Sequence, residues 1–493
     1  MKGLIKQNGI RDLRLNIVLP IIFAAFLFVL LLLFDQSVLK DKATLLSSIV
    51  ICFTLLISLS YAFFKYKTQG LNVNNVTALI IICGFFLRLA YVIRCGYGMN
   101  QHDVESLYTS GHLKYMYNLA MGEGLPDNNN WQFCHPPLHH ALSAGVIKLS
   151  WALGMSNATA FENVQLLTCL YSTLTMFASN AILKECKIGE EIRLYSLSLL
   201  SFHPSMIIFS GSINNDILTV LLMLWAIYFL VKWYNKPSVR SALLCGLFTG
   251  LGMMSKFSAA LIMMSAAIVV FYKFFKYKCL KIKELLIQIL SFLSISLPLG
   301  MWHPVRNFLL FGQKIGHVAP INIDSGLYIG NVSLIKRLIL PFSLEPVGVY
   351  VDVWEEYNLW NYLLRNSLFG EYSFGNEAVA AVAVLLNLVL FVLTIWALIL
   401  IVRARFSNAF GVMPIITVAA LQIISFIIFN INYPFGCSMD FRYIVPVLFC
   451  GAVLLGYGEQ SAIALNSYST KVFSAVLRFT TVAFCIASIL VFI

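Results

Sequence analysis

Charged residues are scarce in this sequence. Asp, Glu, Lys and Arg together make up 11% of the 493 residues, whereas hydrophobic residues make up 59%. Soluble domains carry roughly a quarter charged residues, because their surfaces must be hydrated. The composition therefore excludes an ordinary soluble protein and indicates a chain that lies largely within a membrane.

Several motifs of nucleotide and metal chemistry are also missing. The chain has no G-x-G-x-x-G, Walker or Asp-x-Asp sequence, so a nucleotide sugar is a poor donor candidate. The eleven cysteines show neither C-x-x-C nor zinc-finger spacing. Cys95 and Cys134 fall in polar segments, and spacing alone does not establish a bridge between them.

The sequence is instead rich in apolar runs long enough to cross about 30 Å of hydrocarbon. We expect spans near residues 15–34, 44–64, 76–94, 163–183, 193–210, 216–232, 240–255, 257–272, 285–302, 379–402, 412–430, 443–457 and 472–492. A shorter run at 138–154 is a weaker candidate. The pattern predicts an all-α polytopic membrane protein with about 13 transmembrane helices.

The net charge of +12 is concentrated in short loops between these runs, most densely at Lys273–Lys283. The long segments 95–137 and 303–378 are neutral or acidic. Basic loops normally face the cytoplasm, so both long segments are predicted to lie outside. Only one full span then fits between 138 and 184, and we expect 138–154 to be re-entrant or interfacial unless a neighbouring span is misassigned.

The first long segment carries candidates for chemistry. Residues 101–105 read Gln-His-Asp-Val-Glu, and the segment closes on His135-Pro136-Pro137-Leu138. Asp103 and Glu105 are either solvated loop acids or a general base held near the bilayer. The Pro-Pro step forms a stiff corner that presents His135. That histidine either packs, faces a phosphate or acceptor, or binds a metal together with His139.

Later spans carry further charged residues near their outer ends. Asp216 follows Asn214 and Asn215, and it either favours the start of a helix or shares a site with Asp103. Lys256, Arg306 and Arg442 are predicted to lie outside, against the charge trend. They either snorkel to the interface or form an anion site, and arginine suits a phosphate.

The order of these motifs resembles that of the GT-C membrane glycosyltransferases. An Asp in the first outer loop precedes a (His/Lys)-Pro-Pro-Leu step, an Asn-Asp pair and Gly-x-x-x-Gly-x-x-x-x-x-Lys. Trp-x-x-x-Arg-Asn with Phe-Gly after it, and a late Arg-Tyr, complete the set. Within that superfamily, the chain looks like the protein O-mannosyltransferase and aminoarabinose transferase branch, over roughly residues 76–460.

The resemblance implies an inverting transfer of a sugar from a polyprenyl-phosphate carrier to an acceptor hydroxyl outside the membrane. It implies that Asp103 is the base, that Asp216 is the second acid and that His135 lies near the carrier phosphate. Many relatives have adjacent acids, whereas Val104 intervenes here. The candidate catalytic residues are Asp103, Asp216 and Glu105, and the candidate substrate-binding residues are His102, His135, Asn215, Lys256, Arg306 and Arg442.

The predicted organisation is a GT-C-type bundle with juxtamembrane helices in the first outer loop. Residues 1–75 would add transmembrane helices, 76–460 would form the catalytic core, and 461–493 would form the last span. The expected partners are a polyprenyl-phosphate-linked sugar, a glycan, lipid or protein acceptor, and membrane lipids, but no nucleic acid. No cofactor is specified, and a divalent metal is left open.

The expected location is a bacterial plasma membrane, with the active site on its outer face. A transporter or lipid-linked sugar flippase is the competing class, because the chain has many spans and intramembrane charges. Against that class, the hydropathy shows no internal repeat. A structural scaffold would not explain the clustered outer acids and bases.

Overall fold

The structure is a computed structural model that describes residues 43–68, 72–104, 109–127, 132–277, 281–339, 349–350, 352–404 and 411–492. Within these ranges the regular structure is helical, apart from one antiparallel bridge between Tyr328 and Phe435. The all-α prediction is therefore confirmed. The predicted span at 15–34 lies outside the described residues.

The described chain divides into two compact units. The first contains residues up to Pro126, together with His139–Phe177 and Ile207–Ile217. Its helices are α4 (Ala43–Thr68), α5 (Val73–Arg94), α6 (Gly111–Met121), α7 (Leu138–Ala152) and the first part of α8 (Asn157–Glu185). As the sequence predicted, α7 begins directly after the Pro136-Pro137 step.

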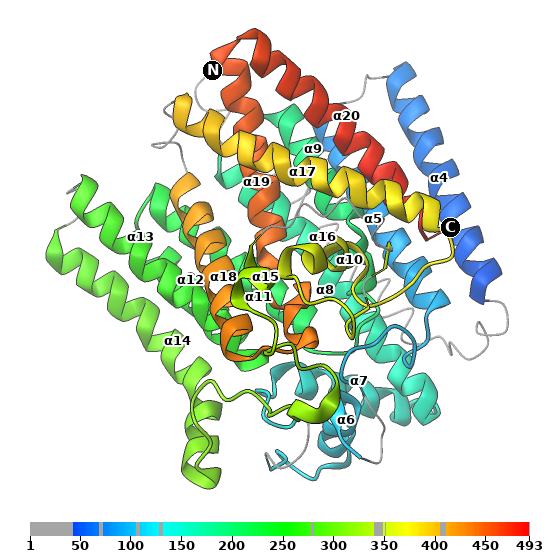
Figure 1. Cartoon of the computed structure of the whole chain (residues 1–493), viewed down its shortest axis with the longest axis vertical. Coiled ribbons are helices and arrows are strands. Elements are labelled where there is room, and N and C mark those ends of the chain that lie inside the picture. Colours follow the sequence, from blue (N-terminus) through cyan, green and yellow to red (C-terminus); the bar gives the residue numbers. More distant parts are fainter. Residues whose placement is uncertain are drawn as a thin grey trace. The chain divides into compact units, whose positions relative to one another are not determined.

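The second unit contains Asp127–Leu138, Ala178–Met206 and Leu218–Ile493. In it α19 packs against α9, α17, α18 and α20, α20 also packs against α9 and α17, and α18 packs against α13 (Figure 1). The helices are α9 (Glu190–Phe202), α10 (Pro204–Ile208), α11 (Asp216–Asn235), α12 (Val239–Ser255), α13 (Leu261–Tyr277), α14 (Ile282–Phe311), α15 (Leu334–Leu338), α16 (Leu359–Phe369), α17 (Glu377–Arg403), α18 (Val412–Asn432), α19 (Pro446–Leu465) and α20 (Tyr468–Leu490).

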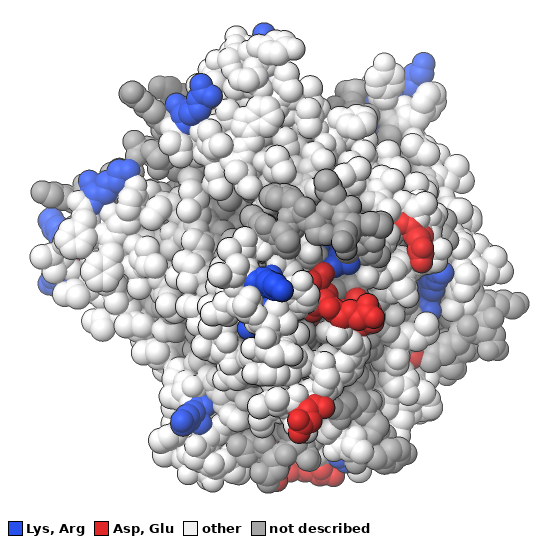
Figure 2. Space-filling view, viewed as in Figure 1, with Lys and Arg blue, Asp and Glu red and all other residues white. Residues whose placement is uncertain are grey.

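Ten helices of the described chain are long and apolar enough to cross a membrane, and α12 is a shorter apolar helix of 17 residues. These findings support a multi-pass membrane protein. The predicted count of about 13 spans is not confirmed. Most described side chains on the face drawn in Figure 2 are uncharged, and acidic side chains gather near the middle of that face.

Two predicted boundaries were wrong, and proline explains the first. The span expected at 193–210 is two helices, α9 and α10, with His203 extended between them (φ −64°, ψ 128°). Pro204 disfavours helical geometry at the residue before it, so α9 stops after 13 residues. The span at 285–302 instead continues through Pro298 and Pro304 to Phe311, so the second long loop starts at residue 312.

Glycines set the close packing of α12 against α14. A Cβ at Gly246 would lie 2.4 Å from the carbonyl oxygen of Phe292, and one at Gly300 would lie 2.6 Å from the sulfur of Met253. Small residues allow such close approach of membrane helices. Because residues 246 and 253 match 292 and 300 in order, the two helices run parallel. The residue that follows α12, Lys256, is therefore at the same end of this pair as the last turns of α14.

Candidate active site

Asp103 lies in a tightly closed loop of the first unit. Its backbone is left-handed (φ 55°), and its carbonyl oxygen accepts a hydrogen bond from the backbone N–H of His112, at 3.0 Å. Gly111 has φ 91°, and a Cβ there would lie 2.4 Å from the carbonyl oxygen of Val104. Glycine is thus required to close the loop. Asp103 is partly exposed.

Asp216 is the first residue of α11 and is 3% exposed. Its backbone N–H donates to Oδ1 of Asn214 at 3.1 Å. The helix-start interpretation of Asp216 is therefore confirmed, and the side chain of Asn214 caps the same first turn. Asn215 is also buried, with 1% exposed.

Hydrogen bonds of Gln101 link the two segments that carry Asp103 and Asp216. Its Nε2 donates to the carbonyl oxygen of Gly211 at 2.8 Å, and its Oε1 accepts from the N–H of Ile213 at 3.0 Å. Asp103 follows Gln101 by two residues, and Asp216 follows Ile213 by three. The fold thus joins two segments that the topology predicted to lie on the same side of the membrane.

Three buried histidines surround these segments. Nε2 of His139 lies 2.9 Å from the carbonyl oxygen of Ile213, so this nitrogen carries the proton and donates. Burial lowers the pKa of His139 to about 4, although the Ile213 carbonyl and the Asp216 carboxylate both favour protonation. Nδ1 of His112 and Nε2 of His140 are 2.8 Å apart. Among the described residues, neither His135 nor His139 belongs to a group of three or more side chains that could hold a metal ion.

In the second unit, two predicted phosphate-binding residues meet at one aromatic ring. Nζ of Lys256 lies 5.0 Å from the ring centroid of Tyr443, and Cζ of Arg442 lies 5.1 Å from it. Nε of Arg442 also lies 3.4 Å from Oδ2 of Asp440, and both of these side chains are buried. The two cations can be no more than about 10 Å apart, because both contact the same ring.

The other predicted residues are placed separately. Nη1 of Arg306 donates to Oδ1 of Asn307 at 2.8 Å, at the same end of the α12–α14 pair as Lys256. His135 is partly buried. Its backbone N–H donates to the carbonyl oxygen of Gln132 at 3.2 Å and so closes a turn. His102 is buried in the first unit. Glu105 lies outside the described residues.

The short helix α16 supports the segment that carries Arg442. Oδ1 of Asn366 accepts the N–H of Phe441 at 2.6 Å. Burial raises the pKa of the Tyr362 phenol, as do the nearby carboxylates of Asp440 and Glu371. Sequence reasoning missed these residues, because nothing in the pattern of α16 distinguishes it from an ordinary amphipathic loop helix.

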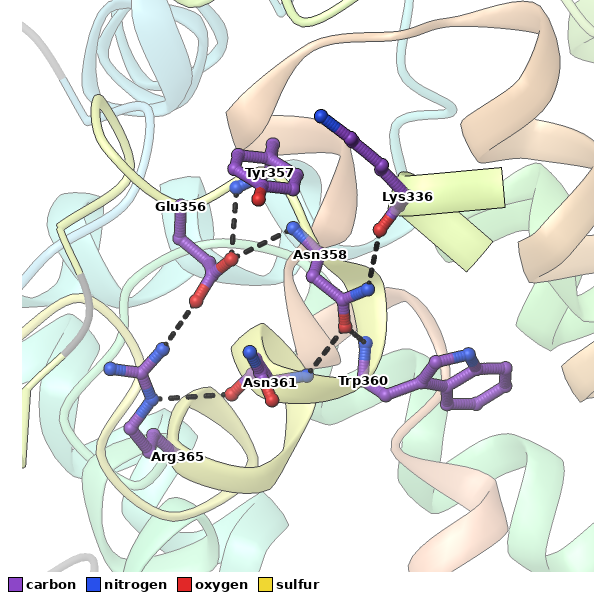
Figure 3. A network of polar contacts seen from close by, with 7 residues as sticks. All are labelled: Lys336, Glu356, Tyr357, Asn358, Trp360, Asn361 and Arg365. Atoms are coloured by element: carbon purple, nitrogen blue, oxygen red, sulfur yellow. Dashed lines mark hydrogen bonds and ion pairs between the residues drawn. The ribbon is translucent and has the colours of Figure 1, made fainter. Parts of the chain in front are cut away.

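A polar network fixes the start of α16 (Figure 3). Nδ2 of Asn358 donates to the carbonyl oxygens of Lys336 and Ile339, at 2.7 and 3.0 Å. Nη2 of Arg365 contacts Oε2 of Glu356 at 2.7 Å. The second long segment thus contains short helices, and side-chain hydrogen bonds attach α16 to the end of α15.

The fold and these groups define a polytopic helical membrane protein with clustered acids and bases. Residues 134–302 match the family model for dolichyl-phosphate-mannose-protein mannosyltransferases. This match confirms the resemblance to the GT-C membrane glycosyltransferases. It covers about a third of the chain and includes His135, Asp216 and Lys256, but not Asp103 or Arg442.

Solved structures also resemble the chain, at low similarity. The Pmt1-Pmt2 protein O-mannosyltransferase complex of S. cerevisiae, bound to its sugar donor, has 14% identity over 53% of this chain and 36% of that one, with a TM-score of 0.37. The Archaeoglobus fulgidus oligosaccharyltransferase has 12% identity over 86% of this chain and 56% of that one, with a TM-score of 0.48. Thus the chain spans about a third and about half of the lengths of these two proteins.

ArnT from Cupriavidus metallidurans, bound to undecaprenyl phosphate, has 12% identity over 84% of this chain and 75% of that one, with a TM-score of 0.48. Similarities this distant define neither a substrate nor a residue's role. A comparison with curated proteins found no match.

Proposed function

We propose that this protein is an inverting glycosyltransferase that moves a sugar from a polyprenyl-phosphate carrier to an acceptor hydroxyl at the outer face of the membrane. The observation that carries the proposal is the meeting of Lys256 and Arg442 at the ring of Tyr443. Asp440 already pairs with Arg442, so Lys256 adds a second cation at this ring, and a bound phosphate would accept charge-assisted hydrogen bonds from both cations. The family match over residues 134–302 supports the same chemistry.

The proposed reaction breaks the bond between the anomeric carbon and the carrier phosphate oxygen. The acceptor oxygen forms the new bond to that carbon from the opposite side, and its proton passes to Asp103. The carrier leaves as an anionic phosphate, which Lys256 and Arg442 stabilise as its charge develops. A phosphate is a good leaving group, so this chemistry needs one carboxylate base more than it needs a general acid.

The partly exposed side chain of Asp103 suits a base that must meet an incoming hydroxyl. We assign Asp216 to orienting the acceptor, because a buried carboxylate accepts hydrogen bonds from hydroxyl groups. His135 and Arg306 are assigned to the carrier phosphate or its approach. The positive-inside distribution of the basic loops supports the outer-face location.

The test uses the purified full-length protein in lipid vesicles. It is offered undecaprenyl-phosphate-linked hexose or pentose in one arm and nucleotide sugars in the other, with membrane glycans, lipids and peptides as acceptors. We expect transfer with release of polyprenyl phosphate in the first arm alone. Transfer from nucleotide sugars, or movement of the lipid-linked sugar across the bilayer without transfer, would overturn the proposal, and the second result would favour a flippase.

A further inference from the structure

The segment just before Asp216 is held by side chains that come from elsewhere in the first unit. Oγ1 of Thr168 donates to the carbonyl oxygen of Ser210 at 2.9 Å. The carbonyl oxygen of Gly211 accepts from Nε2 of Gln165 and from Nε2 of Gln101, each at 2.8 Å. We call residues 210–213 the clamped segment.

Ile213 is bound on both of its backbone polar groups. Its N–H donates to Oε1 of Gln101 at 3.0 Å, and its carbonyl oxygen accepts from Nε2 of His139 at 2.9 Å. The N–H of Ile213 fixes which end of the Gln101 amide is oxygen, so the orientation of that side chain is defined. Irregular backbone at membrane depth persists where the protein satisfies its polar groups, and four side chains do so here.

A second histidine holds the other acidic segment from the same helix. His139 and His140 are adjacent in α7, with their ring centroids 5.6 Å apart. Nε2 of His140 lies 2.8 Å from Nδ1 of His112. The backbone N–H of His112 in turn donates to the carbonyl oxygen of Asp103. Tyr115 stacks on His140, with centroids 4.1 Å apart. Thus α7 contacts the segment that leads to Asp216 through His139, and the loop of Asp103 through His140 and His112.

We infer that Gln101 and His139 are positioning residues, which fix the carboxylates of Asp103 and Asp216 relative to one another. The inference rests on the proposed function, since it assigns the role of these two residues in that reaction. In this role each residue acts through the backbone of the segment it binds and not on the reacting atoms. A misplacement of about 1 Å at a catalytic group can cost on the order of 10²-fold in rate, so loss of the clamp is expected to lower kcat.

The test compares Gln101→Met and His139→Leu with the wild-type protein. Both changes keep the approximate size of the side chain and remove the hydrogen bonds to the clamped segment. We expect kcat to fall by about 10²-fold, with the KM for the lipid-linked donor little changed, because the phosphate-binding groups are untouched. Amide hydrogen exchange at residues 211–216 should be faster in both variants.

Two further variants separate positioning from general stability. His139→Gln offers an amide N–H to the Ile213 carbonyl and should recover part of the lost kcat; it also replaces His139→Leu if that protein does not fold. Thr173→Val is the matched control, since it removes a buried hydrogen bond to the Cys169 carbonyl in the same unit, 2.8 Å long, away from the clamped segment. It should leave both kcat and exchange at 211–216 unchanged.

The outcomes distinguish this inference from the proposed function. If the wild-type protein transfers sugar and both clamp variants keep its kcat, the positioning role is wrong and the function stands. A rise in the donor KM as large, in fold-change, as the fall in kcat would also overturn the positioning role. If the wild-type protein transfers no sugar, the proposed function fails. Unchanged exchange at 211–216 in the variants would then still show that the clamp does not hold this segment.

Discussion

The ammonium nitrogen of Lys256 lies 5.0 Å from the ring centroid of Tyr443, and the guanidinium of Arg442 lies 5.1 Å from the same centroid. Lys256 follows α12, whereas Arg442 and Tyr443 lie nearly two hundred residues later in the chain. Both cations use the electron-rich ring as a partner. Arg442 also has the buried carboxylate of Asp440, so Lys256 is the simpler of the two cations to test.

Lys256→Met should weaken use of the lipid-linked donor. If the ammonium loses one charge-assisted hydrogen bond to the carrier phosphate, binding should fall by about 1.5–3 kcal/mol, or roughly 10- to 150-fold in donor KM. Initial rates at varied donor concentration measure this effect. Lys314→Met changes an exposed lysine and should have no effect. A wild-type donor KM in Lys256→Met would remove Lys256 from the phosphate site.

Asp103→Asn should abolish transfer in a protein that folds and inserts normally. The substitution keeps the shape of the side chain and removes the base, which is worth about 10²–10⁴-fold in rate. The closed loop should persist, because it depends on the backbone carbonyl of Asp103 and on Gly111. Glu123→Gln, in an exposed acid of the same unit, is the control. Turnover near that of the wild-type protein would show that Asp103 is a solvated loop acid.

The sequence was sufficient to predict the all-α fold and most of the long apolar helices, whereas the side of the membrane on which the acids lie stays a prediction. Apolar length and charge bias are local properties, and both are set by the bilayer. The contact of Gln101 with Gly211 spans 110 residues, and nothing near either residue encodes it. Such side-chain-to-backbone contacts become visible only when the packing of α7 and α8 is known.

The prolines show the same limit of prediction from sequence, here for where a helix ends. Pro204 ends α9, yet Pro298 and Pro304 lie within α14. Proline always removes one backbone donor, but neighbouring groups can make the loss tolerable within a membrane helix. A proline in the sequence therefore does not by itself decide whether a helix ends there, because the surrounding packing does. The domain division at residues 75 and 460 stays a prediction.

Stability should fall in acid because of His139. Its pKa in the folded protein is about 4, below the ordinary value of 6.5, so the unfolded chain binds the proton more readily. Stability is then complete above about pH 6.5 and is lost as the pH falls towards 4, by up to about 3 kcal/mol. Thermal unfolding from pH 7 to 4 measures this loss. His139→Gln has no proton to gain and should show a shallower dependence, whereas an identical one would place the acid sensitivity elsewhere.

Asn358→Ala should loosen the attachment of α16. Asn358 accepts the N–H of Trp360 as the N-cap and donates to the carbonyl oxygens of Lys336 and Ile339. Loss of the cap and of two buried hydrogen bonds should cost about 3 kcal/mol in unfolding free energy. Asn376→Ala is the matched control, since it removes an exposed N-cap alone and should cost about 1 kcal/mol. Equal costs in thermal unfolding would contradict a structural role for the two carbonyl contacts.

A buried ion pair joins α19 to α20 in the second unit. Oε1 of Glu459 accepts from Nε and Nη2 of Arg478, at 3.0 and 2.8 Å. The Glu459 side chain is 1% exposed and that of Arg478 is 46% exposed. The carboxylate therefore depends on this arginine, whereas the arginine keeps access to its surroundings and also lies 5.7 Å from the ring centroid of Tyr195.

This asymmetry predicts unequal costs for the two single substitutions. Arg478→Met leaves a buried carboxylate without its cation and should destabilise the protein by about 2–4 kcal/mol, somewhat less than a fully buried pair would lose. Glu459→Gln leaves an accessible arginine and should cost less. The double variant Glu459→Gln/Arg478→Met removes both charges and should recover most of the loss, which thermal unfolding in lipid nanodiscs can measure. If the double variant were as unstable as the sum of the single ones, the ion pair would contribute nothing and the packing of α19 against α20 would account for both losses.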